Sequence, residues 1–378
     1  MKKFLPTAFF IILAIVCAFA WILSGSGYRT GVAQDKFFDI AKDRADKIYA
    51  EQTAATTTDS SDMQITVEPI TPDDPADERE SVVLVFGGDM NLDGKYSDVD
   101  DASDFAPELL SQMRDADIFM HSNVFVFADG GIPADKAYVF RADTSKISLL
   151  EDIGTDVVSL ANNHSFDYGT DGLKITTGVL DNANIAYVGA GLDGTSASEP
   201  HYIDVGGIRI AFTAAMRSER YPKTPEAGEN HAGVVKMYDI EGYLEVIREA
   251  KKNADFVVAY AHWGAENNRW LESEQIEGAK AMVDAGADIV VGAHAHVLQT
   301  ADVYNGKPIF YGLGDLYGEG GLAKITIEAD DTINARFIPF ENVNGVVTPL
   351  TGEKYNSTIA ELDFISHTNV LPDGTISE

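Results

Sequence analysis

The chain has 378 residues and is strongly acidic, with 60 Asp and Glu against 28 Lys and Arg and a formal net charge of −32. This balance disfavours nucleic acid as a partner, because binding there depends on neutralising phosphates with basic side chains. Hydrophobic residues make up 45% of the chain, which excludes wholesale disorder and allows a sizeable core. The length fits one large domain or two ordinary ones.

The N-terminus carries an uncharged, apolar run. Lys2 and Lys3 precede the run from Phe4 to Leu23, which is long enough to cross a bilayer core. The two lysines are expected to stay in the cytoplasm, which puts the rest of the chain outside. We therefore expect a single-pass anchor over residues 1–25, with an extracytoplasmic domain at the cell membrane.

Two other interpretations of this run remain open. Ala18-Phe19-Ala20 resembles a signal-peptidase site, and the only cysteine, Cys17, resembles a lipoprotein cysteine, although Val16 before it is not small. Trp21-Ile22-Leu23 carries the apolar run past the cleavage site and favours a retained anchor. All three interpretations predict export. With no second cysteine, an internal disulfide and a thiolate zinc site are both excluded.

Composition changes along the chain predict further boundaries. Residues 26–52 contain a short amphipathic helix, and residues 53–80 are too poor in apolar side chains to order themselves, so we expect a disordered linker. A folded domain is expected over residues 81–345, followed by a C-terminal extension over residues 346–378.

The folded domain alternates apolar strands with amphipathic helices, which indicates an α/β class. Helices are expected over residues 170–182, 240–253 and 272–285, and residues 323–340 alternate like antiparallel strands. The remaining strands are expected at 82–86, 118–120, 156–160, 208–213, 256–260, 289–291 and 309–311.

Short polar clusters follow several of these strands. The carboxyl ends of strands are where α/β folds place their sites, and imidazoles with carboxylates at successive ends are what a first-row divalent metal needs. Any one cluster alone is more simply a turn or a satisfied polar group; together, and in this order, they favour a site. The clusters are Gly88–Asn91, Ser122-Asn123, Ala161–Asp167, His262–Glu266, Gly292–His296 and Gly314-Asp315.

These motifs resemble the CapA family, proteins of bacterial capsule and poly-γ-glutamate synthesis. The resemblance covers roughly Val82 to Phe340 and is most specific between Lys136 and Pro200. Its main pieces are Tyr138–Ala142, Asp156–His164, Asp167–Gly169, Gly189–Gly191, His262–Gly264, Gly286–Gly292, His294, His296-Val297 and Tyr311–Gly314.

The resemblance implies a metallo-dependent phosphatase-like, four-layer α/β/β/α sandwich. It also implies a divalent ion (Mn, Zn or Fe) that would polarise a phosphate-like or acyl group. The residues it assigns are Asp89, Asn163, His262, His294 and His296 to the metal, His164, Asp167 and Glu266 to catalysis, and Lys136, Arg141 and Asn123 to substrate.

The chain departs from the family pattern at Ala293, where the late histidine cluster of the family has its first His, and at two places that concern an acid or an amide. After Asn123 the family usually carries Leu-Glu, where this chain has Val124-Phe125, so an acidic group expected to bind metal is missing. Near the end, the family's Gly-Asn is Gly314-Asp315. The missing acidic group weakens the inference to two-metal catalysis.

Two functions of different classes therefore remain. One is a metal-dependent hydrolase or transferase-like protein of polymer synthesis, and the other is a non-catalytic, tethered subunit that holds or exports the polymer. A secreted binding protein is a weaker third. The expected partners are an anionic cell-surface polymer or its precursor and membrane-bound synthesis proteins.

The topology is testable on intact cells. Because Lys2 and Lys3 stay inside and the apolar run follows them, a protease added outside should remove the folded domain, detected by an antibody against it. A domain that stays protected until the cells are lysed contradicts this orientation.

Overall fold

The computed structural model describes residues 79–94, 97, 99, 101–218 and 224–378. The expected anchor, the amphipathic helix and nearly all of the linker lie outside these residues. Across the described ranges, no helix has both the length and the apolar character needed to cross a bilayer.

The first large sheet has seven strands in the order β17-β16-β15-β1-β2-β5-β6. Strands β1, β2, β5 and β6 run parallel, whereas β15, β16 and β17 join the other side antiparallel. Their bounds are β1 Val82–Met90, β2 Ile118–Asn123, β5 Val157–Ser159, β6 Ala186–Val188, β15 Gly320–Ile327, β16 Ile333–Val343 and β17 Val346–Pro349.

The second large sheet has six strands in the order β13-β14-β12-β11-β9-β8, with β9, β11, β12 and β14 parallel. The bounds are β8 His201–Val205, β9 Ile208–Met216, β11 Phe256–His262, β12 Ile289–Ala293, β13 Ala301–Tyr304 and β14 Lys307–Phe310. Three two-stranded ribbons pair β3 Val126–Phe127 with β4 Arg141–Ala142, β7 Ala190–Gly191 with β10 Gly233–Val234, and β18 Asn369–Val370 with β19 Ile376–Ser377.

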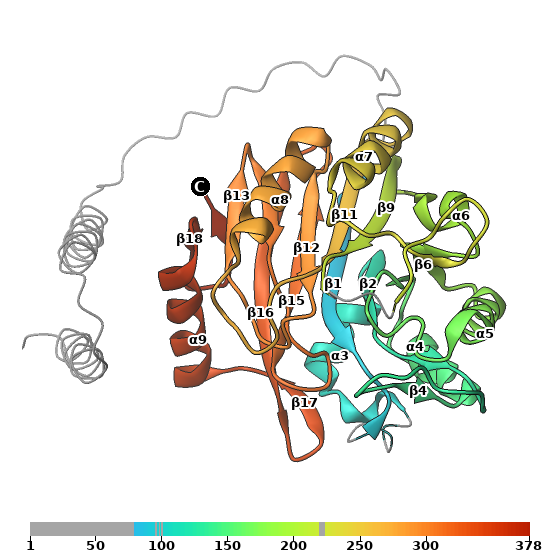
Figure 1. Ribbon diagram of the computed structural model, residues 1–378. Helices are drawn as coiled ribbons and strands as arrows, with labels where there is room; N and C mark the ends of the chain where they lie inside the picture. Colours follow the sequence, from blue (N-terminus) through green and yellow to red (C-terminus); the bar gives the residue numbers. More distant parts are fainter. Residues whose placement is uncertain (1–78, 95–96, 98, 100, 219–223) are drawn as a thin grey trace, which may run out of the picture. The chain divides into compact units, whose positions relative to one another are not determined.

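The two sheets pack face to face, and helices cover the outer faces (Figure 1). Phe86 of β1 and Tyr260 of β11 belong to one buried cluster between the sheets. The layers run helices, sheet, sheet, helices, and the expected mixed α/β class is confirmed. Three helices pack on the seven-stranded sheet: α3 Pro107–Arg114, α4 Ile147–Asp152 and α5 Gly169–Asn182. Two helices pack on the six-stranded sheet: α7 Glu241–Asn253 and α8 Ser273–Ala285. The short helix α6 spans Gly194–Ser198, and 3-10 turns span Ala102–Asp104 and Thr144–Lys146.

Helix α8 shows how the sequence sets the element ends. Glu272 caps its N-terminus in a capping box with Gln275, in which each side chain accepts a hydrogen bond from the backbone N–H of the other residue. Gly286 ends it in the left-handed region at φ 119°, with its N–H directed to the carbonyls of Met282 and Val283. Helix α8 is therefore joined to the buried strand β12 by a short connection.

Residues 346–378, expected as an extension, pack as part of the same fold. Strand β17 continues the seven-stranded sheet, and helix α9 (Gly352–Ile365) inserts Ile359 and Leu362 into the core between the sheets. Ser366 after the helix accepts a hydrogen bond from Thr300 Oγ1 at 2.6 Å. These apolar side chains belong to the buried cluster between the sheets, so this segment packs on the domain expected over residues 81–345.

A bond between the sheets fixes the end of β1. The register of β1 against β2 shifts between Phe86 and Asp89, which leaves the Gly87 carbonyl outside the regular ladder. Tyr260 of the opposite sheet donates its hydroxyl to that carbonyl at 2.7 Å. The last residues of β1 are therefore tied to both sheets.

His121 makes the fold sensitive to acid. Burial lowers the pKa of this imidazole from 6.5 to about 4, and its Nε2 contacts only Thr155 Oγ1 at 3.1 Å. Since the folded pKa lies below the unfolded one, the stability linked to His121 is complete above pH 6.5 and is lost as the pH falls toward 4. Between pH 7 and pH 4 the free energy of unfolding should fall by about 3 kcal/mol more in the wild type than in His121→Leu.

Urea unfolding at several pH values measures this difference. The other buried histidines titrate in both proteins, so they cancel in the comparison. Parallel pH dependence in the wild type and His121→Leu would contradict the assignment.

Candidate metal centre

The five side chains expected to hold a metal converge at one place. Asp89 is the penultimate residue of β1, His262 is the last residue of β11, and Asn163 follows β5. His294 and His296 lie on the loop after β12. These strands belong to two different sheets, so the site forms where the carboxyl ends of both sheets meet.

Close backbone packing brings Asp89 to this place. A Cβ on Gly88 would lie 2.0 Å from the Gly314 carbonyl oxygen, so only glycine allows the approach. The N–H of Asp89 donates to that carbonyl at 2.9 Å, and Leu316 N–H donates to the Asp89 carbonyl at 2.8 Å. Asp89 and Asp315 consequently lie side by side in an isolated parallel bridge.

The Asp89 carboxylate is the centre of the cluster. It is 2% exposed, and its Oδ2 accepts the His294 N–H at 2.8 Å. His262 Nδ1 lies 3.5 Å from Oδ1, and His296 Nδ1 lies 3.6 Å from Oδ2. Both imidazoles therefore approach the same carboxylate, one from each side.

His262 presents an unpaired nitrogen to Asp89. Its Nε2 lies 2.9 Å from Asn163 Oδ1, an oxygen that can only accept, so Nε2 carries the hydrogen. Nδ1 then has a lone pair, and it faces Asp89 Oδ1. Neither of these buried atoms has a hydrogen-bond partner within the described part of the chain. Two facing lone pairs repel each other unless a cation or a proton lies between them.

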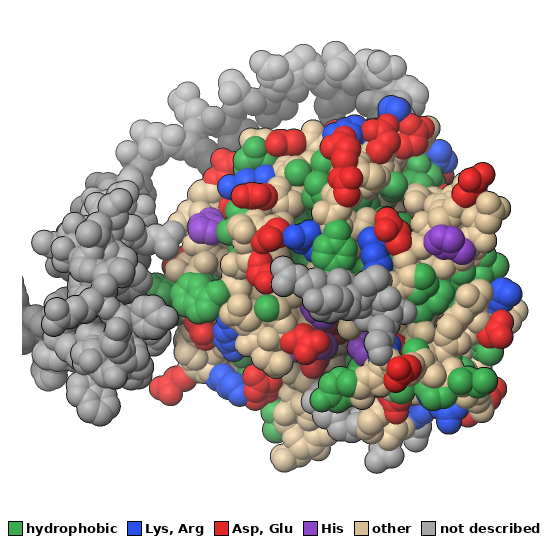
Figure 2. Space-filling view, viewed as in Figure 1, with side chains coloured by type: hydrophobic (Ala, Val, Ile, Leu, Met, Phe, Trp, Pro, Cys, Tyr) green, Lys and Arg blue, Asp and Glu red, His purple; other side chains and the backbone are tan. Residues whose placement is uncertain are grey.

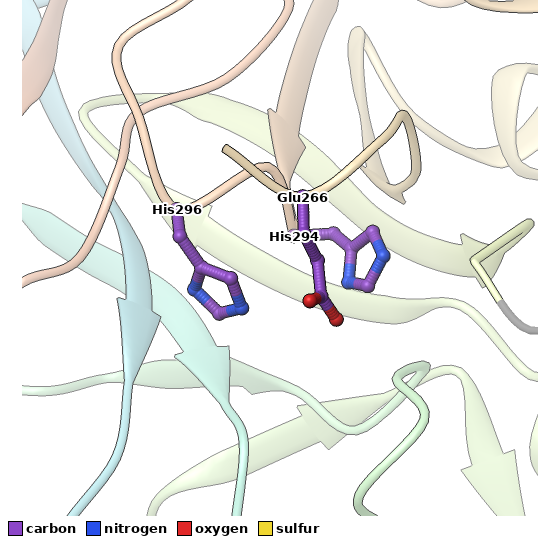
Figure 3. Close-up of side chains that lie close together, drawn as sticks. All are labelled: Glu266, His294 and His296. Atoms are coloured by element: carbon purple, nitrogen blue, oxygen red, sulfur yellow. The ribbon is translucent and has the colours of Figure 1, made fainter. Parts of the chain in front are cut away.

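The loop after β12 holds its histidines in an uncommon backbone conformation. His294 has φ 91° and His296 has φ 58°, a left-handed region in which side chains other than glycine are rare and which recurs at functional sites. Glu266, on the loop after β11, directs its carboxylate between the two imidazoles (Figure 3). One ligand atom from each of these three residues lies within 4.8 Å of the others.

Burial sets the charges of the group. It lowers the pKa of His294 to about 3 and that of His262 well below its usual range, so both are neutral near pH 7. It raises the pKa of Asp89 to about 7. Burial alone would lower the pKa of His296, but the hydrogen bond that its Nδ1 donates to Asp315 and the charge of Asp89 outweigh burial and raise the pKa to about 9.

These residues fit a divalent ion. Neutral imidazoles, the state of His262 and His294 near pH 7, are the form that binds metal, whereas His296 has to release its proton to do so. Carboxylate oxygen with imidazole nitrogen suits manganese, iron or zinc. The facing Asp89 Oδ1 and His262 Nδ1, both buried and unpartnered, are where a cation removes the repulsion. His294 and His296 complete the group, with Asp315 beside them.

The three residues expected in catalysis do not all lie together. His164 Nδ1 bonds Asp167 Oδ2 at 2.6 Å. The Phe140 ring packs against the imidazole at a tilt of 34°, with 4.3 Å between ring centroids, and the Phe140 N–H donates to the same Asp167 oxygen at 2.7 Å. His164 follows Asn163, whose Oδ1 lies 2.9 Å from His262 Nε2, so the His164–Asp167 pair is next to the metal group. Glu266 is instead on the opposite loop, with His296.

The three residues expected to hold substrate have separate surroundings. Lys136 donates to Asp167 Oδ1 at 2.8 Å and to the Asn163 carbonyl, and its side chain is 9% exposed. Arg141 is exposed and lies 5.7 Å over the ring of Tyr168. Asn123 is buried, and its Nδ2 donates to the Phe125 carbonyl at 2.8 Å. Of the three, Arg141 alone presents a charge to solvent.

The structure accounts for the two departures from the family pattern that concern an acid or an amide. Phe125, at the missing acid, is fully buried and packs edge-on against Phe127 at 4.9 Å between centroids. Asp315, absent from the expected ligand set, bonds His296 Nδ1 at 2.7 Å. The signal for Asp315 was available in the sequence, because Gly314-Asp315 is one of the polar clusters that follow strands.

The acidity of the chain does not form one patch around the centre. Figure 2 shows acidic and basic side chains interspersed over this face, with histidine atoms visible near its middle. The local charges of the site are therefore set by the buried group and not by a single-sign surface.

Comparisons with known proteins give one family. The model of the bacterial capsule synthesis protein PGA_cap family matches residues 83–319. The "PGA biosynthesis protein CapA" of Bacillus subtilis is 39% identical over 192 residues, which cover 50% of each chain. The "Capsule biosynthesis protein CapA" of Bacillus anthracis is 38% identical over 198 residues, 50% of this chain and 47% of that one. This chain thus spans about half the length of the curated relatives it matches.

Among solved structures, a putative 5′-nucleotidase from Staphylococcus aureus in complex with α-ketoglutarate aligns with a TM-score of 0.44 and 14% identity. The alignment covers 72% of this chain and 55% of that one.

Removing the two loop histidines should remove the ion. In the wild type, Mn²⁺ at about 100 times its Kd should raise the free energy of unfolding by about 2.7 kcal/mol, because it binds only the folded state. The double variant His294→Ala/His296→Ala should show little of this increase and retain little metal after dialysis. His201→Ala, at an exposed position of β8, is the matched control and should behave as the wild type.

Metal content by mass spectrometry and thermal unfolding with and without Mn²⁺ measure both effects. Equal metal content in the double variant and the wild type would exclude this centre.

Proposed function

This chain belongs to the bacterial capsule synthesis protein PGA_cap (CapA) family, and on that basis we propose that it is a metal-dependent phosphoesterase-type hydrolase of surface-polymer synthesis. We further propose that it is exported and anchored at the cell membrane by residues 1–25. The proposed partners are an anionic polymer or its precursor and the membrane-bound synthesis proteins. Capsule polysaccharide and polyglutamate both fit this chemistry.

One observation carries the proposal. Asp89 Oδ1 and His262 Nδ1 face each other at 3.5 Å, buried and without partners among the described residues. A structural cluster would satisfy these groups with hydrogen bonds, since each unsatisfied buried group costs roughly 1–3 kcal/mol. The arrangement supports a bound cation at the centre of the family's motif residues.

The residues around the centre support hydrolysis. Asp89, His262, His294 and His296 would hold a divalent ion, which supplies Lewis-acid polarisation of a phosphoryl or acyl group. Asp167 orients His164, because its Oδ2 accepts a hydrogen bond from Nδ1 of the imidazole. The other ring nitrogen, Nε2, then remains to exchange a proton with a leaving group. The Phe140 ring packs against the imidazole at a tilt of 34° and covers part of it.

The net charge of −32 makes an ion useful for an anionic substrate. Such a substrate is repelled by the average surface, so a local positive feature is needed to bind it. Of the two basic side chains expected to provide this, Lys136 is paired with Asp167, whereas Arg141 is exposed. Arg141 together with the ion is the proposed anion-binding feature.

A non-catalytic subunit is the second candidate, and Phe125 favours it. At the place where the family usually carries an acid, this side chain is 0% exposed and packed among apolar residues. A centre that has lost a carboxylate there would still bind one ion and still order the loops. In that case the site would hold an anionic group of the polymer without cleaving it.

Turnover separates the two candidates. The wild type with Mn²⁺ should hydrolyse bis(p-nitrophenyl) phosphate, and His164→Gln should lower kcat by about 10²–10⁴-fold, because it removes a proton-transferring group. Metal content should stay at the wild-type level, because the ring of His164 bonds Asp167 and is not a proposed metal ligand.

The measurement is steady-state hydrolysis after removal of unbound metal, with the His294→Ala/His296→Ala variant as the metal-free reference. Hydrolysis no faster than that reference, in a wild type that still binds Mn²⁺, would reject the hydrolase and leave the non-catalytic subunit.

A further inference from the structure

Lys136 occupies a place that its charge alone would not predict. A lysine near an anion-binding site is expected to reach substrate, yet this side chain is only 9% exposed. Its Nζ donates to Asp167 Oδ1 at 2.8 Å and to the backbone carbonyl of Asn163. Both acceptors belong to the loop after β5 that carries His164. The ammonium group is therefore committed to protein partners.

The two partners of Lys136 lead to different parts of the centre. Asn163 bonds His262 Nε2 through its side chain, and that contact sets the tautomer that turns His262 Nδ1 toward Asp89. The Asn163 carbonyl is fixed by two donors, Lys136 Nζ and Thr224 Oγ1, the latter at 2.9 Å. Lys136 thus helps to orient the peptide from which the Asn163 side chain projects.

The other partner is Asp167, whose side chain is fully buried. A buried carboxylate stays ionised only when it is paired and hydrogen-bonded. The Lys136 ammonium is the cation paired with Asp167, and it donates to Asp167 Oδ1. The other oxygen, Asp167 Oδ2, bonds His164 Nδ1 and the Phe140 N–H. The Ala134 N–H also donates to the Asp167 carbonyl, which joins the loop of Lys136 to the loop of His164.

We infer that Lys136 is a positioning residue, a buried ammonium that ties the metal-ligand side of the centre to the His164–Asp167 pair, and not a substrate-binding cation. The inference rests on the proposed function, because it concerns the organisation of the same centre. It removes one of the two cations expected in the substrate site and leaves Arg141, which is exposed.

The chain offers a control lysine, Lys251, which is more exposed than Lys136 and whose carboxylate partner Asp288 also pairs with Lys307 Nζ at 2.8 Å. Lys251 Nζ also pairs with a buried carboxylate, Asp288 Oδ2 at 2.8 Å, and also donates to a backbone carbonyl, that of Asp255. Asp288 precedes β12, so this pair lies at the end of the strand opposite to the His294 loop. Lys136→Met and Lys251→Met each remove an ammonium from a buried carboxylate, but only the first should affect the centre.

The experiment measures Mn²⁺ binding to the metal-stripped full chain by calorimetry, then binding of inorganic phosphate to the Mn²⁺-loaded chain. Lys136→Met should weaken Mn²⁺ binding about 10–100-fold, the range for losing a group that orients a ligand. Lys251→Met should bind Mn²⁺ as the wild type does. Lys136→Arg keeps the cation and its donors and should recover most of the affinity. Phosphate should bind the loaded Lys136→Met and the loaded wild type with the same Kd.

Folding of the variants is controlled by a double-variant cycle. Lys136→Met leaves Asp167 as a buried charge without its lysine, so adding Asp167→Asn should recover part of the lost stability. This coupling is measured by urea unfolding even where Lys136→Met binds metal too weakly for calorimetry. Additive effects of the two substitutions would overturn the pairing on which the inference depends.

The remaining outcomes each decide one question. Unchanged Mn²⁺ affinity in Lys136→Met, or an equal loss in Lys251→Met, would overturn the positioning role while the metal centre stands. Weaker phosphate binding by Lys136→Met with unchanged Mn²⁺ affinity would make Lys136 a substrate-binding residue. A wild type that binds no Mn²⁺ would reject the proposed centre, and the positioning role with it.

Discussion

The site depends on the Asp89 carboxylate, which is buried between two imidazoles at the seam of two sheets. His262 and His296 come from the second sheet and lie 3.5 Å and 3.6 Å from its two oxygens, whereas Asp89 is the penultimate residue of a strand in the first sheet. Burial raises the pKa of Asp89 to about 7 and keeps His262 neutral. The arrangement is stable only with positive charge among these groups. The packing that buries Asp89 therefore also decides which charges the site can hold.

The backbone around this carboxylate is adapted to the approach. Gly88 has no room for a side chain against the Gly314 carbonyl, and Tyr260 bonds the Gly87 carbonyl released by the irregular register of β1. His294 and His296 adopt left-handed conformations that most residues avoid. The segments that present ligands therefore carry part of the conformational cost of the fold.

Electrostatic balance also explains the two departures from the family pattern that concern an acid or an amide. Phe125 gives the position after β2 to the apolar core, so it offers no carboxylate there. At position 315 this chain has an aspartate where the family has an asparagine, and Asp315 pairs with His296. The negative charge of the centre therefore lies mainly on the side of Asp89 and Asp315.

The sequence by itself determined the elements and the ligand types, and the tertiary structure decided what each side chain contacts. Apolar runs such as Phe256–His262 and the cap at Gly286 are local signals, so the α/β class and the order of polar clusters could be predicted from the chain. The partners of Lys136, the pairing of Asp315 with His296 and the packing of residues 346–378 are contacts between distant segments. No local pattern encodes them, because they arise only when two sheets bring separate strand ends within a few ångströms.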